Sequence, residues 1–596
     1  MRTRANERRE FIRRLRTDPV FLSRHTGALS LALCRKLGNR ITLALTDVHR
    51  GRKKWPNWLE QRELPQSRPD AGKLAGTLPQ YASFVGSPRA DQTSMVQIGQ
   101  AEHQNLEDVE DYFADNRWGF LLQSLLEGAA DWNGGIARCL RWVESHTHKA
   151  DRAWEAYSSC ERIANLLVFL AAMPGPLRSV ATDARIDSFL VESLHWVYRH
   201  LEYYGPAETN NHLLNNARAL VMGGVATRNS AAVAAAVKTL RWSLPELIGE
   251  GGFLRERSSH YQLVVLNWLL DTWKFLSASL GQDSADARFL RGYVERMVTA
   301  AAMLCDRDGN LTALIGDISP DMTPAQSSER LDLLYPDFWP IDAVFIQRCL
   351  VRDGWFRLSD GKSLVLGNLP PGQYPFNFPT HGHCDATHFV FRHEDQEILV
   401  DPGRYRYTRD AVSEFQQSAL GHNLPLVNGF APLCESVISD RKWCPVPYAR
   451  AQLQVGEYGD DIVLQHDGFA RSTPVRFHRR RLSLTETGLV VIDSFEGEAS
   501  VWLELCWHFA EDFHRVDAHG LRLRGGRREV KMTVDGVPGP ASIRPVRDVD
   551  PGGWVSRAYG QRRPALALCL GWQVVLPAVV TTQFQVTKPQ TMKAIT

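Results

Sequence analysis

The sequence changes character at Trp355-Phe-Arg-Leu-Ser-Asp-Gly-Lys-Ser-Leu-Val-Leu366, where long helical patterns give way to short strand-like runs. Downstream of this stretch, alternating or β-rich runs are separated by turn signals at short intervals. This pattern is typical of antiparallel strands in a sandwich. The predicted strands are Ser363–Leu366, Thr387–Arg392, Glu397–Val400, Asp461–Gln465, Gly488–Asp493, Val501–Phe509 and Val574–Val580.

Upstream of the same stretch, the sequence predicts amphipathic helices. Apolar residues recur three and four positions apart, which is the spacing of an α-helix with one buried face. Glycine- and proline-rich breakers separate the helical segments, so we expect successive antiparallel helix pairs in a bundle, a solenoid or a toroid. The predicted helices are Arg162–Ala172, Ile186–Tyr203, Ala231–Leu247 and Tyr261–Leu280.

The length of the chain requires more than one domain. A chain of 596 residues exceeds what one hydrophobic core supports, so two domains are the minimum. We expect an N-terminal helical or irregular extension at 1–105, packed on a helical domain at 106–350, followed by an antiparallel β-sandwich domain at 351–596. Interfaces between domains favour clefts, which makes the boundary between the last two the expected place for a site.

Charge and cysteine content narrow the class of protein. The formal net charge of +2 provides no strong field for nucleic acid. Arginines cluster in the first sixteen residues, where a membrane-surface or polyanion-binding arm and a solvated tail are both open interpretations. No apolar run has the length and composition of a secretory signal or a transmembrane helix. The ten cysteines lack CxxC pairs, so we expect reduced thiols in a cytoplasmic protein.

Histidines and carboxylates recur in the strand-rich half, where His381 and His383 stand two positions apart and on a strand would face the same side. Imidazole and carboxylate are the side chains that bind borderline metals and move protons, and two histidines with one carboxylate form a good zinc half-site. The alternative is that these histidines are hydrogen-bonded core or turn residues, because an Asp-Pro-Gly segment among them is a turn signal in itself. The three segments are His381-Gly-His383-Cys-Asp385, Asp401-Pro-Gly403 and Gly421-His422-Asn423.

Two asparagines and a histidine open a predicted helix in the other half, in the run Thr209-Asn-Asn-His212. Asparagine at a helix start usually caps the helix. Two asparagines followed by a histidine exceed what a cap needs, however, and an amide beside an imidazole is also a plausible pair for neutralising an anion. The sequence leaves both interpretations open.

A tyrosine follows several charged residues at a second helix start. Tyr261 closes the run Arg255-Glu-Arg257-Ser-Ser-His. Such a tyrosine is usually a packing residue, but two nearby arginines can also lower the pKa of its phenol toward the phenolate. The sequence contains no Walker A loop, GxSxG elbow, HExxH segment or dinucleotide fingerprint, so a nucleotide or hydride mechanism has no support.

Taken in this order, the motifs resemble the heparinase II/III superfamily of polysaccharide lyases over roughly Trp154 to His508. The resemblance rests on the order and separation of the motifs, because each motif alone is weak. The matching segments are Trp154-Glu-Ala-Tyr157 with Arg162-Ile163 and Asn165, His200-Leu-Glu202 with Asn210-Asn-His212, Glu256-Arg-Ser258 with Tyr261, Gly316-Asp317, His381-Gly-His-Cys-Asp-Ala386, Asp401-Pro-Gly403 with Tyr405 and Tyr407, and Gly421-His-Asn423.

The resemblance implies a fold and a reaction. The expected fold is an incomplete (α/α) toroid followed by an antiparallel β-sandwich, and the expected reaction is β-elimination on a uronic-acid polysaccharide. By this resemblance Asn211 neutralises the uronate carboxylate, with His212 beside it as neutraliser or base. Tyr261 is expected to be base, acid or both, and His381 to be a second proton-handling residue in the sandwich.

The resemblance also implies a metal and a set of substrate contacts. His383, Asp401 and His422 match positions that hold a structural divalent metal, often zinc. Arginines bind carboxylates in bidentate fashion, so those near the motifs are expected to bind neighbouring acidic sugars. The predicted substrate-binding residues are Arg257, Arg404, Tyr405 and Tyr407.

The expected partner is therefore an acidic polysaccharide or oligosaccharide, with no nucleic acid and no transmembrane segment. Two alternatives to the lyase stay open at this stage. A uronate C5-epimerase forms the same carbanion and reprotonates it on the opposite face, so it needs the same groups. A non-catalytic glycan-binding or assembly protein of surface polysaccharide synthesis needs the binding residues alone.

Overall fold

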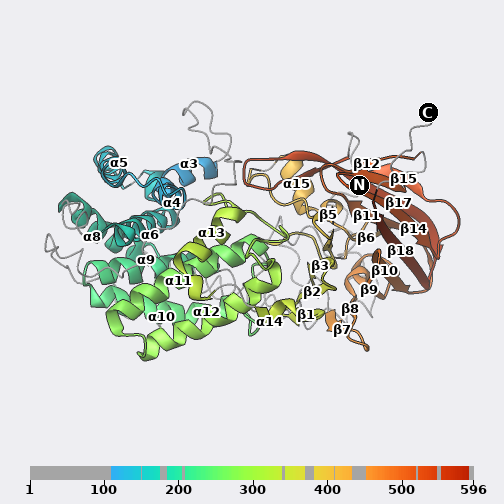
Figure 1. Cartoon of the computed structure of the whole chain (residues 1–596), viewed down its shortest axis with the longest axis horizontal. Coiled ribbons are helices and arrows are strands. Elements are labelled where there is room, and N and C mark those ends of the chain that lie inside the picture. Colours follow the sequence, from blue (N-terminus) through green and yellow to red (C-terminus); the bar gives the residue numbers. More distant parts are fainter. Residues whose placement is uncertain are drawn as a thin grey trace, which may run out of the picture.

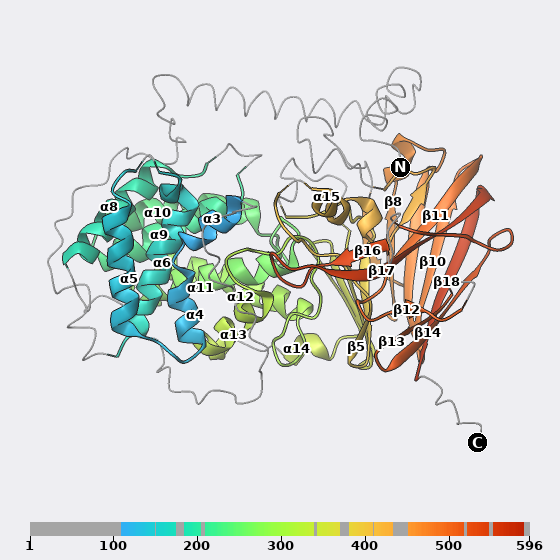
Figure 2. The same cartoon turned by 90° about the horizontal axis from the view of Figure 1, so that it is seen from above.

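The computed structural model of the chain describes residues 109–149, 151–174, 184–203, 209–338, 342–369, 381–408, 410–432, 451–517, 521–546 and 552–588. The extension predicted at 1–105, with its arginine run, lies outside these residues. Helices gather at one end of the molecule and strands at the other (Figures 1 and 2). The predicted fold class is confirmed, because an incomplete (α/α) toroid of antiparallel helices is followed by an antiparallel β domain.

The helical domain follows the apolar periodicity of the sequence. Each of the predicted helices is present, although the one expected to reach Tyr203 ends at Arg199. The helices are α3 (Val109–Asp115), α4 (Gly119–Leu126), α5 (Trp132–Ser145), α6 (Ala156–Ala172), α8 (Ala184–Arg199), α9 (Asn211–Ala226), α10 (Ser230–Leu247), α11 (Ser259–Leu280), α12 (Ala285–Leu304), α13 (Pro324–Leu334) and α14 (Asp342–Phe345).

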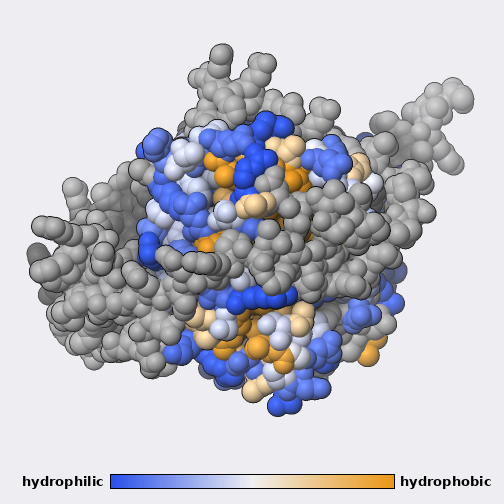
Figure 3. Space-filling view, turned by 90° about the vertical axis from the view of Figure 1, so that its left-hand side faces the viewer, coloured by the Kyte–Doolittle hydropathy of each residue, from blue (hydrophilic) through white to orange (hydrophobic). Residues whose placement is uncertain are grey.

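Helices α9 and α11 form the centre of this domain. Helix α9 packs against α6, α8, α10 and α11, and α11 packs in turn against α12 and α13. Both helices are buried along most of their length because neighbours flank them on several sides. The outer helices α5 and α8 bury one face only, and the end of the molecule that they cover shows hydrophilic residues with scattered hydrophobic patches (Figure 3).

The β domain contains three antiparallel sheets within the described residues. Their strand orders are β1-β2-β3-β4-β5, β12-β13-β14-β18-β10-β9-β8-β7 and β15-β17-β11-β6, with β16 paired to β17. The strands are β1 (Cys349–Arg352), β2 (Trp355–Ser359), β3 (Ser363–Asn368), β4 (Phe389–His393), β5 (Gln396–Leu399), β6 (Pro425–Val427), β7 (Ala451–Val455), β8 (Asp461–His466), β9 (Phe477–Thr485), β10 (Gly488–Glu496), β11 (Ser500–His508), β12 (His514–Arg515), β13 (Arg522–Gly525), β14 (Arg528–Asp535), β15 (Ser542–Pro545), β16 (Gly552–Val555), β17 (Arg563–Val575) and β18 (Ala578–Thr587).

The sheet β1–β5 lies between the helices and the other two sheets (Figures 1 and 2). Its side chains alternate between the two cores, as the two-residue period of a strand requires. Trp355 and Leu366 belong to the helical core, whereas Phe356 and Val365 belong to the sandwich core. This sheet therefore connects the helical domain to the rest of the β domain, which has three sheets among the described residues.

Two expectations about strands are wrong. The predicted strand Val574–Val580 is the end of β17 and the start of β18, joined through Leu576 and Pro577, because proline has no N–H for a ladder bond. The segment His381–Asp385 is a turn that precedes β4, so strand alternation does not orient its two histidines.

The cysteines also depart from the prediction. Cys506 on β11 and Cys569 on β17 face each other in the strand register and form a disulfide. The expectation that all thiols are reduced is thus wrong for this pair. The free cysteines among the described residues are Cys139, Cys160, Cys305, Cys349 and Cys384. Separately, no helix in the described ranges combines the length and the apolar character needed to cross a bilayer.

Candidate active site

The N-termini of α9 and α11 carry the polar residues predicted from the helical half. The Asn210 side chain accepts a hydrogen bond from the His212 N–H at 3.1 Å and caps α9. Asn211 is then the first helical residue, and its side chain is fully buried. Ser258 caps α11 in the same way, accepting from the Tyr261 N–H at 3.0 Å. The capping interpretation therefore applies to Asn210, and the anion-neutralising role stays a prediction for Asn211.

His381 joins these helix ends to the β domain. Its ring stacks on that of Tyr261, with the centroids 3.6 Å apart and the planes 8° from parallel. His381 Nε2 lies 3.3 Å from Asn211 Nδ2 and 3.3 Å from Glu256 Oε2. The structure thus brings together three residues predicted to be catalytic, from two domains and from positions far apart in sequence. We call Asn211, Tyr261 and His381 the central cluster.

The Tyr261 phenol has a second phenol as its partner. Tyr261 Oη and Tyr407 Oη lie 2.8 Å apart. Burial raises the pKa of Tyr261 well above its ordinary value, and the carboxylates of Asp321 and Asp317 raise it further. Burial likewise raises the pKa of Tyr407. Both residues are therefore neutral phenols near neutral pH, which suits them to donating protons.

The expectation that arginines lower the pKa of Tyr261 is wrong. Arg257 has a backbone φ of 60°, and its guanidinium contacts Asp385 at 2.9 Å and the side chain of Asn368. Arg255 donates to the Glu246 carbonyl at an exposed position. Neither guanidinium is among the strongest influences on the Tyr261 pKa, and burial raises that pKa. Both guanidiniums are paired with other groups, and burial is the largest cause of the raised Tyr261 pKa.

His212 follows Asn211 on α9, and its ring pairs with a carboxylate. Its Nδ1 contacts Glu202 Oε1 at 2.7 Å, and its ring centroid lies 4.7 Å from that of Tyr157. Burial alone lowers the pKa of His212, but the charge of Glu202 and the hydrogen bond to it prevail and raise it to about 9. His212 is therefore charged near neutral pH, which fits a neutraliser of anions and not a base.

The His212–Glu202 pair makes stability depend on pH. The His212 pKa of about 9 in the folded state exceeds the value of about 6.5 for an unfolded chain. The pair then stabilises the fold fully below pH of about 6.5, and this contribution is lost as the pH rises through about 9. We expect His212→Gln to cost stability at pH 6 but little at pH 10, as measured by urea unfolding. An equal cost at both pH values would contradict the pairing.

The predicted substrate-binding residues occupy different environments. Arg257 is buried against Asp385, and Arg404 is buried with Nη1 3.5 Å from Asp317 and Nε donating to the Arg406 carbonyl. These contacts do not favour the substrate role predicted for the two arginines, because both guanidiniums are engaged inside the protein. Tyr405 is half-buried beside the guanidiniums of Arg406 and Arg562. Tyr407 alone reaches the central cluster, through Tyr261.

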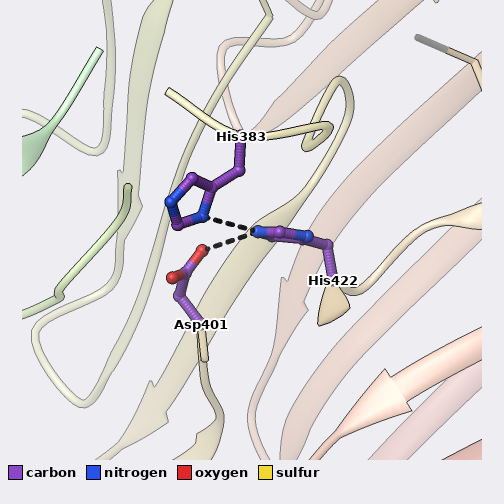
Figure 4. Close-up of side chains that lie close together, drawn as sticks. All are labelled: His383, Asp401 and His422. Carbon is purple, nitrogen blue, oxygen red and sulfur yellow. Dashed lines mark hydrogen bonds and ion pairs between the residues drawn. The ribbon is translucent and has the colours of Figure 1, made fainter. Parts of the chain in front are cut away.

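A second cluster lies in the β domain beside the first. His383, Asp401 and His422 are buried, and one ligand atom from each lies within 4.8 Å of the others. His383 Nδ1 is 3.3 Å from His422 Nε2, which is 3.4 Å from Asp401 Oδ2. All three side chains point to one spot (Figure 4). The convergence predicted for these residues is therefore present, and we call His383, Asp401 and His422 the metal-type cluster.

Outer hydrogen bonds assign the tautomers of both histidines. His383 Nε2 donates to Asp317 Oδ1 at 2.9 Å, which leaves Nδ1 as a lone pair. His422 Nδ1 donates to the Ser418 carbonyl at 2.8 Å, which leaves Nε2 as a lone pair. Two imidazole lone pairs and a carboxylate oxygen consequently face one another in a buried space. Such an arrangement is unfavourable unless a proton or a metal cation lies between the three atoms.

The spacing of these atoms fits a tetrahedral metal site. Metal–ligand bonds of about 2.0–2.1 Å at tetrahedral angles separate ligand atoms by about 3.3–3.4 Å, close to the separations seen here. Asp401 raises the pKa of His422 in spite of burial, so the cluster attracts positive charge. His388 holds Asp401 in place. Its Nδ1 accepts a hydrogen bond from the Asn423 N–H at 2.9 Å, and its Nε2 lies 3.1 Å from Asp401 Oδ2.

Three residues that contact the two clusters were not predicted as site residues. Glu256 accepts from the Asn211 N–H at 2.6 Å and faces His381. His388 supports Asp401, and Asp317 contacts both His381 and His383. The only sequence signals for them were their places inside or near the motifs, Glu256 before Arg257 and Asp317 after a glycine. Those signals do not reveal which side chain each would touch.

The comparisons with known proteins agree with this architecture. Residues 350–587 match the family model described as heparinase II/III-like, C-terminal. A crystal structure of heparinase III is similar at a TM-score of 0.58 and 13% identity, over 82% of this chain and 79% of the other. A heparan sulfate lyase HepC mutant from Pedobacter heparinus is similar at a TM-score of 0.53 and 14% identity, over 98% and 91%. No curated protein sequence matches the chain.

Proposed function

We propose that the protein is a polysaccharide lyase that cleaves a uronic-acid-containing polysaccharide or oligosaccharide by β-elimination. The match of residues 350–587 to the heparinase II/III-like C-terminal model and the fold shared with heparinase III support this proposal. The observation that supports this most is the central cluster. The Asn211 amide lies 3.3 Å from the His381 imidazole, and the His381 ring stacks on that of Tyr261, so an amide donor, an imidazole and a phenol from two domains come together, as the elimination requires.

The elimination removes the C5 proton of a uronate and expels the O4 substituent, leaving a C4–C5 double bond. Negative charge builds on the carboxylate as the C5–H bond breaks, so donors must stabilise it there. The Asn211 amide and the charged His212 are the candidates, and both lie at the start of α9, where the helix dipole also favours an anion.

Proton transfers fall to the other two members of the central cluster. C5 of a uronate is bonded to the carboxylate carbon, so a carboxylate bound at the Asn211 amide would place C5 close by. His381 Nε2 lies 3.3 Å from that amide, and we therefore assign His381 as the base that accepts the C5 proton. The neutral phenol of Tyr261 donates a proton to the departing O4, and Tyr407 supplies a hydrogen bond to the phenolate that results. Charge is thus conserved: one proton is taken at C5 and one is given at O4.

The cluster of His383, Asp401 and His422 would hold a divalent cation, and its two imidazole nitrogens and one carboxylate oxygen suit zinc. Such an ion would supply folding energy to the loops that carry His381 and His422. No step of the elimination passes through it. Its proposed role is to hold in place the segments of the β domain that carry His383, Asp401 and His422.

A panel of acidic polysaccharides tests the proposed reaction. The purified protein is incubated with glycosaminoglycans, with alginates and with a neutral glucan as control, and the ultraviolet absorbance of the new double bond is followed. We expect absorbance to grow on at least one uronate polymer and not on the glucan. Inverted uronates without absorbance would indicate a C5-epimerase, and binding without either product would indicate a glycan-binding protein. Activity on the neutral glucan alone would overturn the proposal.

A further inference from the structure

Asp317 lies between the two clusters and contacts both of them. Its Oδ2 is 3.2 Å from His381 Nδ1, and its Oδ1 is 2.9 Å from His383 Nε2. The side chain is buried, and Arg404 Nη1 lies 3.5 Å from the same Oδ1. Arg404 supplies a positive charge beside this buried side chain, and a ring nitrogen of each histidine faces one of its oxygens. One carboxylate therefore serves two histidines, with one oxygen for each.

The backbone of Asp317 is tied to the same two domains. Its N–H donates to the His381 carbonyl at 2.8 Å, and its own carbonyl accepts from Ser258 Oγ at 2.6 Å. Ser258 is the residue that caps α11 and fixes the helix turn carrying Tyr261. Asp317 thus connects the start of α11, the central cluster and the metal-type cluster through three hydrogen-bonded groups.

The preceding glycine makes this approach possible. Gly316 has a φ of 82°, and a Cβ there would lie 2.7 Å from both the Arg257 and the His381 carbonyl oxygens. Only glycine fits at such a contact and conformation without displacing backbone. The two residues of the pair Gly316-Asp317 therefore act together. Glycine lets the backbone pass close to two carbonyl oxygens, and aspartate then contacts both histidines.

We propose that Asp317 is a positioning residue shared by the two clusters, which sets the ring orientation of His381 for the proton transfer and of His383 for metal binding. A carboxylate that accepts from one imidazole nitrogen leaves the other nitrogen as the lone pair, and here it does so twice. The proposal rests on the proposed lyase function for His381 but not for His383. Under this proposal, metal affinity and turnover both depend on Asp317, although Asp317 itself binds neither metal nor substrate.

The test uses Asp317→Asn in the full chain. Asparagine keeps the size of the side chain and one acceptor oxygen, but its NH2 group only donates, so at most one of the two histidine N–H groups keeps an acceptor and the negative charge is lost for both. Loss of an outer carboxylate of this kind typically costs about 10–100-fold in metal affinity or activity. We expect zinc affinity, measured by competition with a chromogenic chelator, and kcat each to fall by about 10–100-fold, with KM nearly unchanged.

Asp271→Asn is the matched control. Asp271 is as buried as Asp317 and binds Arg218, Arg330 and Tyr335 in the toroid core, away from both clusters. We expect this variant to lose stability while the folded fraction keeps its zinc affinity and kcat. A fall of the same size in both variants would show a general loss of packing, and would overturn the positioning role.

Asp317→Glu carries the test if the asparagine variant does not fold. Glutamate keeps the charge but places its oxygens about one methylene further out, so it cannot keep both contacts. We expect a lower zinc affinity or a lower kcat in spite of the retained charge. Wild-type zinc affinity and kcat in this variant would overturn the proposal. If the wild type cleaves no uronate polymer, the lyase function fails, while the zinc measurements still decide whether Asp317 positions His383.

Discussion

Tyr261→Phe is expected to lower kcat by about 10²–10⁴-fold, the usual cost of removing a general acid or base. The Tyr261 ring would stay stacked on His381, because phenylalanine keeps the aromatic face, and only the hydroxyl that contacts Tyr407 is lost. Since the Tyr261 phenol acts only during proton transfer, KM should change little. Steady-state kinetics on the polymer identified by absorbance gives both quantities.

Tyr198→Phe is the matched control for this prediction. The Tyr198 side chain is buried on α8, and burial raises its phenol pKa to about 12, yet the residue lies outside the central cluster. It should keep kcat within about twofold of the wild type, as for substitutions away from the chemistry. If Tyr261→Phe were as active as Tyr198→Phe, the phenol of Tyr261 would have no part in the reaction.

The sequence predicts the helices and most strands of this protein because each has a regular apolar period. It does not predict the separate layer formed by β1–β5. Residues of β2 and β3 are apolar on both faces, as Trp355 and Phe356 illustrate, and only the packed structure shows which face meets the helices and which meets the sandwich. The disulfide was missed for a related reason, since Cys506 and Cys569 become neighbours only when β11 pairs with β17.

The site was predictable to the extent that its chemistry resides in motifs. Asn211, Tyr261 and His381 meet, as do His383, Asp401 and His422. The partners of these residues were not predictable, because they depend on contacts across the domain boundary.

Arg257 is the clearest case of such a contact. From the sequence it was expected to stand beside Tyr261, but its left-handed backbone and its bond to Asp385 place the charge elsewhere. Asp317 is the opposite case, a residue in a weak two-letter motif that contacts both clusters.

The largest expected effect on stability concerns the metal-type cluster. We expect the purified protein to contain about one equivalent of zinc, and a strong chelator to lower the melting temperature. An ion bound at 100 times its Kd stabilises a fold by about 2.7 kcal/mol, which corresponds to about 5–10 °C for a domain of 150–250 residues. The physical reason is that His383 Nδ1, His422 Nε2 and Asp401 Oδ2 converge in a buried space, where one bound cation would contact all three atoms and neutralise the carboxylate.

His422→Gln tests this assignment without a chelator, and His393→Gln is its control. His393 is a buried histidine of the same domain that contacts Ser363 Oγ at 2.9 Å and lies outside the cluster. We expect His422→Gln to lack zinc in elemental analysis and to melt at the temperature of the chelated wild type, with no further change when chelator is added. His393→Gln should keep its zinc and its response to chelator. A zinc-free wild type whose melting temperature ignores the chelator would contradict the site, because the lone pairs would then need no cation.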